Sequence, residues 1–158
     1  MGWVRVDWQA SLDLTGRVLL YVSVPLSFPL SIALLYGESV RPFVVAIAVT
    51  LALGWAFRAL PGDPGNLGPR EAFLAVAAIW LLVALIGAIP FAVSGTGTLD
   101  RPINALFEAM SGLTTTGATV LVDFSLHDRS VLMWRQLIQW LGGLGILVLA
   151  TAILSELG

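Results

Sequence analysis

Residues 107–121 read FEAMSGLTTTGATVL, and this stretch decides the fold that we predict for the chain. It begins with a short helical pattern and ends in threonine and glycine residues that carry no such pattern. Long apolar segments flank it, at residues 72–94 and 133–154. In a bilayer, irregular backbone persists only where protein buries it or water bathes it. The order therefore predicts a spanning helix, a half-helix, an irregular Thr/Gly segment and a second spanning helix.

The composition is that of an integral membrane protein. Of the 158 residues, 58% are hydrophobic and 11% are charged, and the mean hydropathy is +0.91. Soluble domains are less apolar and carry about twice that share of charge. The formal net charge of -2 and the absence of a basic run argue against a nucleic-acid partner. The sequence has no cysteine and one histidine, so we expect no disulfide, no multi-histidine metal cluster and no cofactor. It also lacks a nucleophile–base pair or phosphate loop that would indicate an enzyme.

Four parts follow one another along the chain. Residues 1–17 place tryptophans among polar residues, and they are either a short interfacial helix or a frayed terminus. Residues 18–60 form a helical hairpin, residues 61–71 a loop rich in proline and glycine, and residues 72–158 a helix–loop–helix repeat. The predicted fold is all-α, with four transmembrane helices at about residues 18–36, 43–60, 72–92 and 132–154, and one re-entrant half-helix.

The half-helix, at about residues 103–112, would be only about 15 Å long, against a hydrocarbon core of about 30 Å. Its C-terminal carbonyls carry a partial negative charge, which favours a cation just beyond them. The residues at that place offer only uncharged oxygens: Thr114, Thr115, Thr116, Gly117 and Ala118. Such ligands suit a weakly hydrated monovalent cation better than magnesium or calcium, which prefer carboxylates. The other interpretation is an ordinary polar loop.

Two residues of the half-helix, Glu108 and Gly112, are predicted to support this segment. A carboxylate within a membrane is costly and marks a functional position. Glu108 could attract cations or anchor the loop. The alternative, which we favour because Glu108 precedes the segment by several residues, is that it hydrogen-bonds to backbone N–H groups behind the segment.

Three glycines of the last span, Gly142, Gly143 and Gly145, are predicted to allow close packing between helices. A hinge beside a pore is the functional alternative for the same residues.

Charged side chains near the start of the last span are expected to be solvated. Arg135 lies in its first turn, and arginines near helix ends usually extend toward the interface. The loop before it shows no metal-ligand spacing and is expected to be an exposed polar loop; its charged residues are Asp123, His127, Asp128 and Arg129.

Residues 107–119 resemble the first pore segment of the Trk/Ktr-type potassium uptake proteins, and within them the TrkH-like membrane subunits of bacteria. Three further stretches carry the same resemblance: WRQLIQWLGGLGI at residues 134–146, REAFL at residues 70–74 and GAIPF at residues 87–91. The resemblance covers nearly the whole chain.

This resemblance implies potassium transport through a selectivity filter, with Thr115, Thr116 and Gly117 coordinating the ion. It implies two additional N-terminal helices followed by one helix–pore-loop–helix repeat. It also implies a place in the inner (plasma) membrane with a cytoplasmic N-terminus, a homodimer, and a cytosolic nucleotide-binding regulatory subunit as partner. Membrane lipids would surround the helices.

The chain departs from that family pattern in the number of its repeats. Family members carry four repeats around one pore, whereas this sequence contains one. A potassium filter takes its carbonyls from four loops. We therefore expect a part of a longer protein, or other copies or chains that supply the remaining loops. The alternative function is a non-conducting helical membrane module for assembly or regulation.

Overall fold

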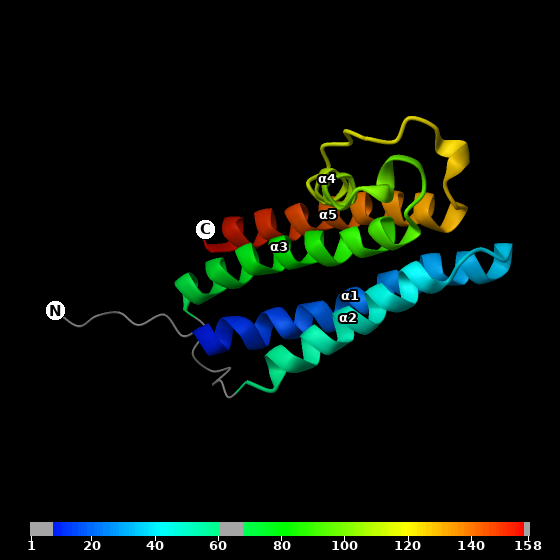
Figure 1. Ribbon diagram of the computed structural model, residues 1–158. Helices are drawn as coiled ribbons and strands as arrows, with labels where there is room; N and C mark the ends of the chain where they lie inside the picture. Colours follow the sequence, from blue (N-terminus) through cyan, green and yellow to red (C-terminus); the bar gives the residue numbers. More distant parts are fainter. Residues whose placement is uncertain (1–7, 61–67, 157–158) are drawn as a thin grey trace.

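The computed structural model describes residues 8–60 and 68–156, and the regular structure in these ranges is helical throughout (Figure 1). The elements follow in the order α1 (Trp8–Tyr36), α2 (Arg41–Arg58), α3 (Pro69–Ser94), the 3-10 helix η2 (Gly97–Asp100), α4 (Pro102–Leu113), the 3-10 helix η3 (Phe124–Leu126) and α5 (Arg129–Glu156). Within this part of the chain, α1, α2, α3 and α5 are long and apolar enough to cross a membrane. The predicted all-α fold with four candidate spans is confirmed.

α1 begins earlier than predicted. It starts at Trp8, so residues 8–17 form the first turns of a long helix and not a separate interfacial helix or a frayed end. The first part of that expected segment, residues 1–7, lies outside the described residues. One reason for the earlier start of α1 is a local ion pair: the Arg17 guanidinium pairs with the Asp13 carboxylate at 2.8 Å, one helical turn away. Such a pair supports a helix through residues that an apolar pattern alone does not predict.

α3 also begins earlier than predicted, at Pro69 rather than near residue 72. Proline suits the first turn of a helix, because the N–H that it lacks would have no partner there. Most of the loop predicted at residues 61–71 lies outside the described residues.

α1 and α2 form a closely packed hairpin, in which glycines face each other. A Cβ atom added to Gly54 would lie 2.8 Å from Leu20 Cδ2, and one added to Gly16 would lie 2.9 Å from the Gly54 carbonyl oxygen. Small residues at such a contact let two backbones approach closely, which is how helices associate in membranes.

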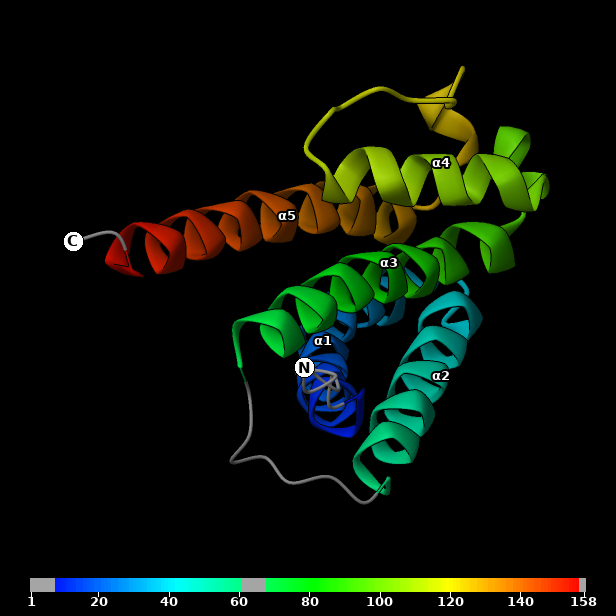
Figure 2. The ribbon, with the colours of Figure 1, turned by 90° about the vertical axis from the view of Figure 1, so that its left-hand side faces the viewer.

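α3 lies between this hairpin and the last two helices. It packs against α1 and α2 on one side and against α4 and α5 on the other (Figure 2). The buried Trp134 of α5 donates its indole N–H to the Gly87 carbonyl of α3 at 2.9 Å. This bond fixes α5 to α3.

The turn between α1 and α2 also holds the start of α5. The Glu38 carboxylate accepts the backbone N–H groups of Arg129 and Ser130, both at 2.9 Å. The first N–H groups of a helix have no intrahelical partner, and a carboxylate there also suits the helix dipole. Partial burial raises the pKa of Glu38, but hydrogen bonds from Ser130 and Arg129 and the Arg129 charge outweigh it, so the pKa lies below its usual value. The Arg129 guanidinium lies 4.4 Å from the centroid of the Tyr36 ring.

Candidate functional site

α4 is a twelve-residue helix that packs between the longer helices α3 and α5. Pro102 opens it, and its buried face consists largely of small side chains, Ala105, Ala109 and Gly112 among them. A Cβ atom added to Gly112 would lie 2.7 Å from Ile138 Cγ2 of α5. α4 therefore lies directly on α5. At 1.5 Å per residue its length is about 18 Å, well short of a hydrocarbon core of about 30 Å.

The C-terminus of α4 meets the middle of α5. A Cβ atom added to Gly142 would lie 1.8 Å from the carbonyl oxygen of Leu113, the last residue of α4. Gly142 lies near the centre of α5 (Arg129–Glu156). The close-packing interpretation is supported for this glycine. Gly143 and Gly145 make looser contacts, because their added Cβ atoms would lie 3.9 Å from Thr115 Cγ2 and 3.6 Å from Trp80 Cζ2.

α4 ends in a left-handed turn that is built on a threonine. Thr115 has φ 59°, and it is the one non-glycine residue with positive φ among the described residues. Its N–H donates to the Gly112 carbonyl at 2.9 Å, and the next N–H, of Thr116, donates to the Ser111 carbonyl at 3.0 Å. This pair of bonds is the Schellman pattern, in which the left-handed residue is usually glycine. A β-branched residue there is strained by roughly 1–2 kcal/mol, and such strain is concentrated at functional sites.

The turn directs a row of carbonyl groups away from α4. The N–H groups of Thr115, Thr116 and Gly117 all donate back to α4, the last of them to Ser111 at 3.3 Å. In a planar trans peptide the C=O points opposite to the N–H of the following residue. The carbonyls of Thr114, Thr115 and Thr116 therefore point away from the helix. Gly117 continues the turn with φ 76°, a conformation that is easy only for glycine.

None of the described residues donates a hydrogen bond to the carbonyls of residues 114–117, and all four residues are exposed. The side chains of Thr114 and Thr116 are engaged with each other, with 2.9 Å between their hydroxyl oxygens. The polar groups that remain open in this segment are therefore the main-chain oxygens and the Thr115 hydroxyl. This part of the Thr/Gly segment, residues 114–117, is hereafter called the carbonyl row.

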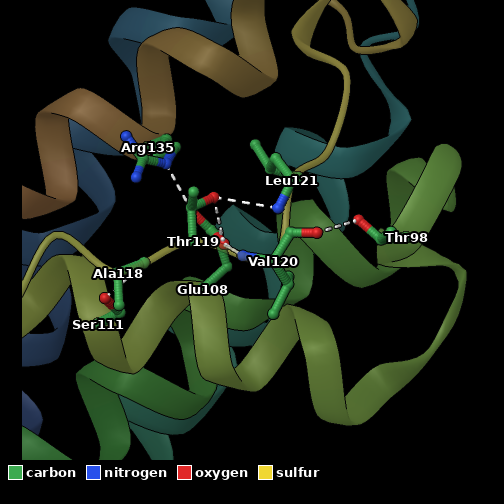
Figure 3. A network of polar contacts seen from close by, with 8 residues as sticks. All are labelled: Thr98, Glu108, Ser111, Ala118, Thr119, Val120, Leu121 and Arg135. Carbon is green, nitrogen blue, oxygen red and sulfur yellow. Dashed lines mark hydrogen bonds and ion pairs between the residues drawn. The ribbon is translucent and has the colours of Figure 1, made fainter.

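The rest of the segment, residues 118–121, is tied to the protein by its own carbonyls. The Ala118 carbonyl accepts the Ser111 hydroxyl at 2.6 Å, and the Val120 carbonyl accepts the Thr98 hydroxyl at 2.9 Å (Figure 3). This engagement distinguishes Ala118 from the four residues before it. It does not support the predicted ion-binding role for the Ala118 carbonyl.

A buried carboxylate also anchors residues 118–121. Glu108 is 1% exposed, and it accepts the Val120 N–H at 3.0 Å and the Thr119 hydroxyl at 2.9 and 3.0 Å. Its remaining partner is the Arg135 Nε–H of α5 (Figure 3). The geometry agrees with the favoured alternative for Glu108, hydrogen bonding behind the segment. It also anchors the loop, and the groups that bind the carboxylate, from Thr119, Val120 and Arg135, all lie outside the carbonyl row.

The prediction for Arg135 was wrong. It does not extend to the interface; its side chain is 13% exposed and pairs with Glu108. The reason is that a carboxylate on a different helix faces it, and pairing satisfies both charges better than leaving Glu108 buried alone. Sequence reasoning therefore missed a residue of the site. The signal that could have revealed it was the presence of two opposite charges within adjacent apolar helices.

The loop before α5 is only partly as predicted. Asp123 is exposed and accepts the N–H and hydroxyl of Ser125 at 2.9 and 2.7 Å, which lowers its pKa below the usual value. His127, however, is 7% exposed, with its Nδ1 2.8 Å from the Thr96 hydroxyl. The expectation of a solvated histidine was wrong, because the η2 region of the chain folds over it.

A groove lies beside the carbonyl row along α5. Its lining combines polar and apolar side chains: Thr115, Gln136, Gln139, Trp140, Gly143, Leu144 and Leu147. The two glutamine side chains are unusual in a helix of this apolar character. Polar side chains at membrane depth generally face a protein interior or a water-filled space.

These features define a class of protein: across residues 8–60 and 68–156 it is helical with four candidate membrane spans, and a short helix brings exposed backbone carbonyls to the middle of a long one. The family described as "TrkH: Cation transport protein" matches residues 38–158. That match covers most of the chain, and the chain belongs to the TrkH family.

Individual relatives agree with this family. The chain is 41% identical over 150 residues to the Trk system potassium uptake protein TrkH of Halomonas elongata, covering 93% of this chain and 31% of that protein. It is 38% identical over 158 residues to the protein of the same name from Escherichia coli K12, covering 97% of this chain and 32% of that protein. The chain thus spans about a third of the length of these relatives.

The fold also matches a solved structure. The crystal structure of the potassium transporter TrkH from Vibrio parahaemolyticus superposes with a TM-score of 0.82 at 35% sequence identity. The match covers 92% of this chain and 31% of that chain.

Proposed function

We propose that this chain takes part in potassium transport across a membrane and supplies one side of the ion-selective path. In this proposal α4 is a re-entrant half-helix, the Thr/Gly segment after it is a filter loop, and Thr114, Thr115, Thr116 and Gly117 line the path. Residues 72–158 then form one helix–pore-loop–helix repeat behind a helical hairpin. The three relatives reported above are named as potassium uptake proteins or a potassium transporter, and these names support the choice of ion.

The observation that carries this proposal is the carbonyl row. Three successive carbonyls point away from α4 because the N–H groups that follow them are held by α4. Oxygens fixed in this way can replace the water shell of a cation, as the carbonyls of potassium filters do. Membership of the TrkH family makes a cation the expected ligand, and the strained Thr115 is better explained by such a role than by an ordinary polar loop.

Electrostatics favours a weakly hydrated cation at the carbonyl row. α4 ends there, and the C-terminus of a helix carries about half a negative charge. The nearest carboxylate behind the segment, Glu108, is paired with Arg135, so it contributes little net charge. Partial charges of this size stabilise a monovalent ion without holding it too tightly to leave.

A complete filter requires more than this chain provides in one copy. Potassium filters are rings of carbonyls from four loops. The relatives are about three times as long as this chain, so further repeats in a longer polypeptide are the source that we propose. We also propose an inner-membrane location with a cytoplasmic N-terminus, and a homodimer that binds a cytosolic nucleotide-binding subunit. These last features rest on the family resemblance.

The test is ion uptake by the complete assembly that contains this chain, reconstituted into lipid vesicles. We expect potassium to enter faster than sodium, and rubidium, which resembles potassium in size, to compete with it. Empty vesicles are the control for leakage. Equal uptake of sodium and potassium, or no uptake above the control, would contradict the proposed function and would favour a non-conducting membrane module.

A further inference from the structure

The Glu108–Arg135 pair connects two helices at the back of the Thr/Gly segment. Glu108 comes from α4 and Arg135 from α5, and the two residues are separated by 27 positions in the sequence. Both side chains are largely buried, at 1% and 13% exposure. Breaking a buried pair by removing one partner is strongly destabilising because it leaves an uncompensated charge. The pair therefore ties what Glu108 holds to the position of α5.

Glu108 holds the second part of the Thr/Gly segment, residues 118–121, which is hereafter called the distal limb. Its carboxylate accepts the Val120 N–H and the Thr119 hydroxyl, and the Thr119 oxygen in turn accepts the Leu121 N–H at 3.1 Å (Figure 3). The carbonyl row, residues 114–117, is the proximal limb: the turn at the end of α4 holds its start, and its other end continues directly into the distal limb at Ala118. The two limbs thus have different anchors, and only the distal one depends on α5 through a side-chain charge.

The helix turn that carries Arg135 is itself fixed. The neighbouring Trp134 is 1% exposed and donates to Gly87 of α3. The helix start is fixed by Glu38, which accepts the first N–H groups of α5. Arg135 therefore projects from a rigid part of the fold, as a side chain that positions another group must.

We propose that Arg135 is a positioning residue for ion selection. Its guanidinium orients the Glu108 carboxylate, which sets the distal limb and so determines how the carbonyl row is presented. Arg135 itself does not contact the ion. This inference rests on the proposed function of the segment, but its structural part can be tested without transport.

The principal variant is Arg135→Gln, with Arg129→Gln as the matched control. Both arginines lie in the first turns of α5, but the Arg129 guanidinium is exposed and stacks on Tyr36 rather than reaching α4. Hydrogen exchange of the complete assembly is measured by mass spectrometry on peptides that cover residues 118–122. We expect roughly tenfold faster exchange there in Arg135→Gln, because Glu108 loses the partner that orients it, and no change in Arg129→Gln.

Transport supplies the second readout. Arg135→Gln should lower the preference for potassium over sodium about tenfold at a similar amount of assembled protein, because the distal limb is no longer held in one position. Arg135→Lys, which keeps the charge but not the planar fork, should recover part of that preference. If Arg135→Gln fails to assemble, the double variant Glu108→Gln/Arg135→Gln removes both buried charges, and the same two measurements are made on it.

The outcomes separate the two proposals. Exchange and selectivity that match Arg129→Gln, in the single variant or in the double variant, would overturn the positioning role of Arg135. A wild-type assembly that does not transport potassium would instead overturn the proposed function, while the exchange measurement would still show whether Arg135 holds the distal limb.

Discussion

Alanine at position 142 should separate the end of α4 from α5 and abolish potassium uptake. The added Cβ atom, whose position the backbone fixes, would lie 1.8 Å from the Leu113 carbonyl oxygen, which is itself a backbone atom. No side-chain rotation can relieve it, so one helix must move. Overpacking typically costs about 1–3 kcal/mol and occasionally more, and this contact belongs at the upper end of that range. The movement also displaces the carbonyl row, which begins at Thr114, the residue after Leu113. The measurement is the thermal midpoint of the assembly in detergent, followed by potassium uptake in vesicles.

The neighbouring glycine provides the control for this prediction. An added Cβ atom at Gly143 would lie 3.9 Å from Thr115 Cγ2, which is an ordinary contact. Gly143→Ala should therefore keep a thermal midpoint close to that of the wild type. If Gly142→Ala and Gly143→Ala had the same midpoint and the same uptake, the close approach of α4 to α5 would be wrong.

Alanine at position 117 should reduce ion selection while leaving the fold intact. The added Cβ atom has room, since its nearest neighbour would be Gln139 Nε2 at 3.7 Å. The backbone does not tolerate it as well, because φ is 76° and a left-handed conformation costs an alanine roughly 1–2 kcal/mol. Relaxing that strain rotates the peptide groups on either side and turns carbonyls of the row. A loss of about 1.4 kcal/mol in ion discrimination would lower the potassium-over-sodium ratio about tenfold.

Gly95 offers a control with the same strain at a different place. Its φ is 57°, its nearest contact for an added Cβ atom is 3.9 Å, and it caps α3 away from the carbonyl row. Gly95→Ala and Gly117→Ala should lose similar amounts of stability, and only Gly117→Ala should lose selectivity. Equal potassium-to-sodium ratios in the two variants would argue that the Thr/Gly segment does not select the ion.

The sequence predicts the helices and the short element between them because their signals are local. Apolar length identifies the spans. The short helix predicted at residues 103–112 is observed at Pro102–Leu113, because Pro102 marks its start and Thr114 begins the irregular backbone after it. The start of α1 lies further outward than predicted because two of its polar residues, Asp13 and Arg17, pair with each other on the same helix.

The conformation of Thr115 could not be predicted in the same way. Local preference favours a glycine in the left-handed position that ends a helix, and the sequence has its glycine two residues later. Thr115 lies two residues after Leu113, whose carbonyl oxygen packs closely on Gly142, 29 positions further along the chain. A contact between two helices thus lies next to the strained residue, and a pattern along one segment does not contain that information.

The charged contacts were missed for a related reason. Glu38 binds the backbone N–H of Arg129, 91 positions away, and Glu108 binds Arg135 across two helices. Each residue alone has an ordinary interpretation: Glu38 as a turn residue, and Arg135 as an arginine near a helix end. Their pairing depends on which helix ends the fold brings together, and that follows from the arrangement of all five α-helices described.

The central claim is that the carbonyls of residues 114–117 contact the transported ion. It is tested most directly by anomalous diffraction from crystals of the complete assembly grown in rubidium in place of potassium. We expect an anomalous peak beside these carbonyls, on the side facing away from α4. A map with no peak at the carbonyl row, or with rubidium held only at carboxylates such as Asp123, would contradict the claim.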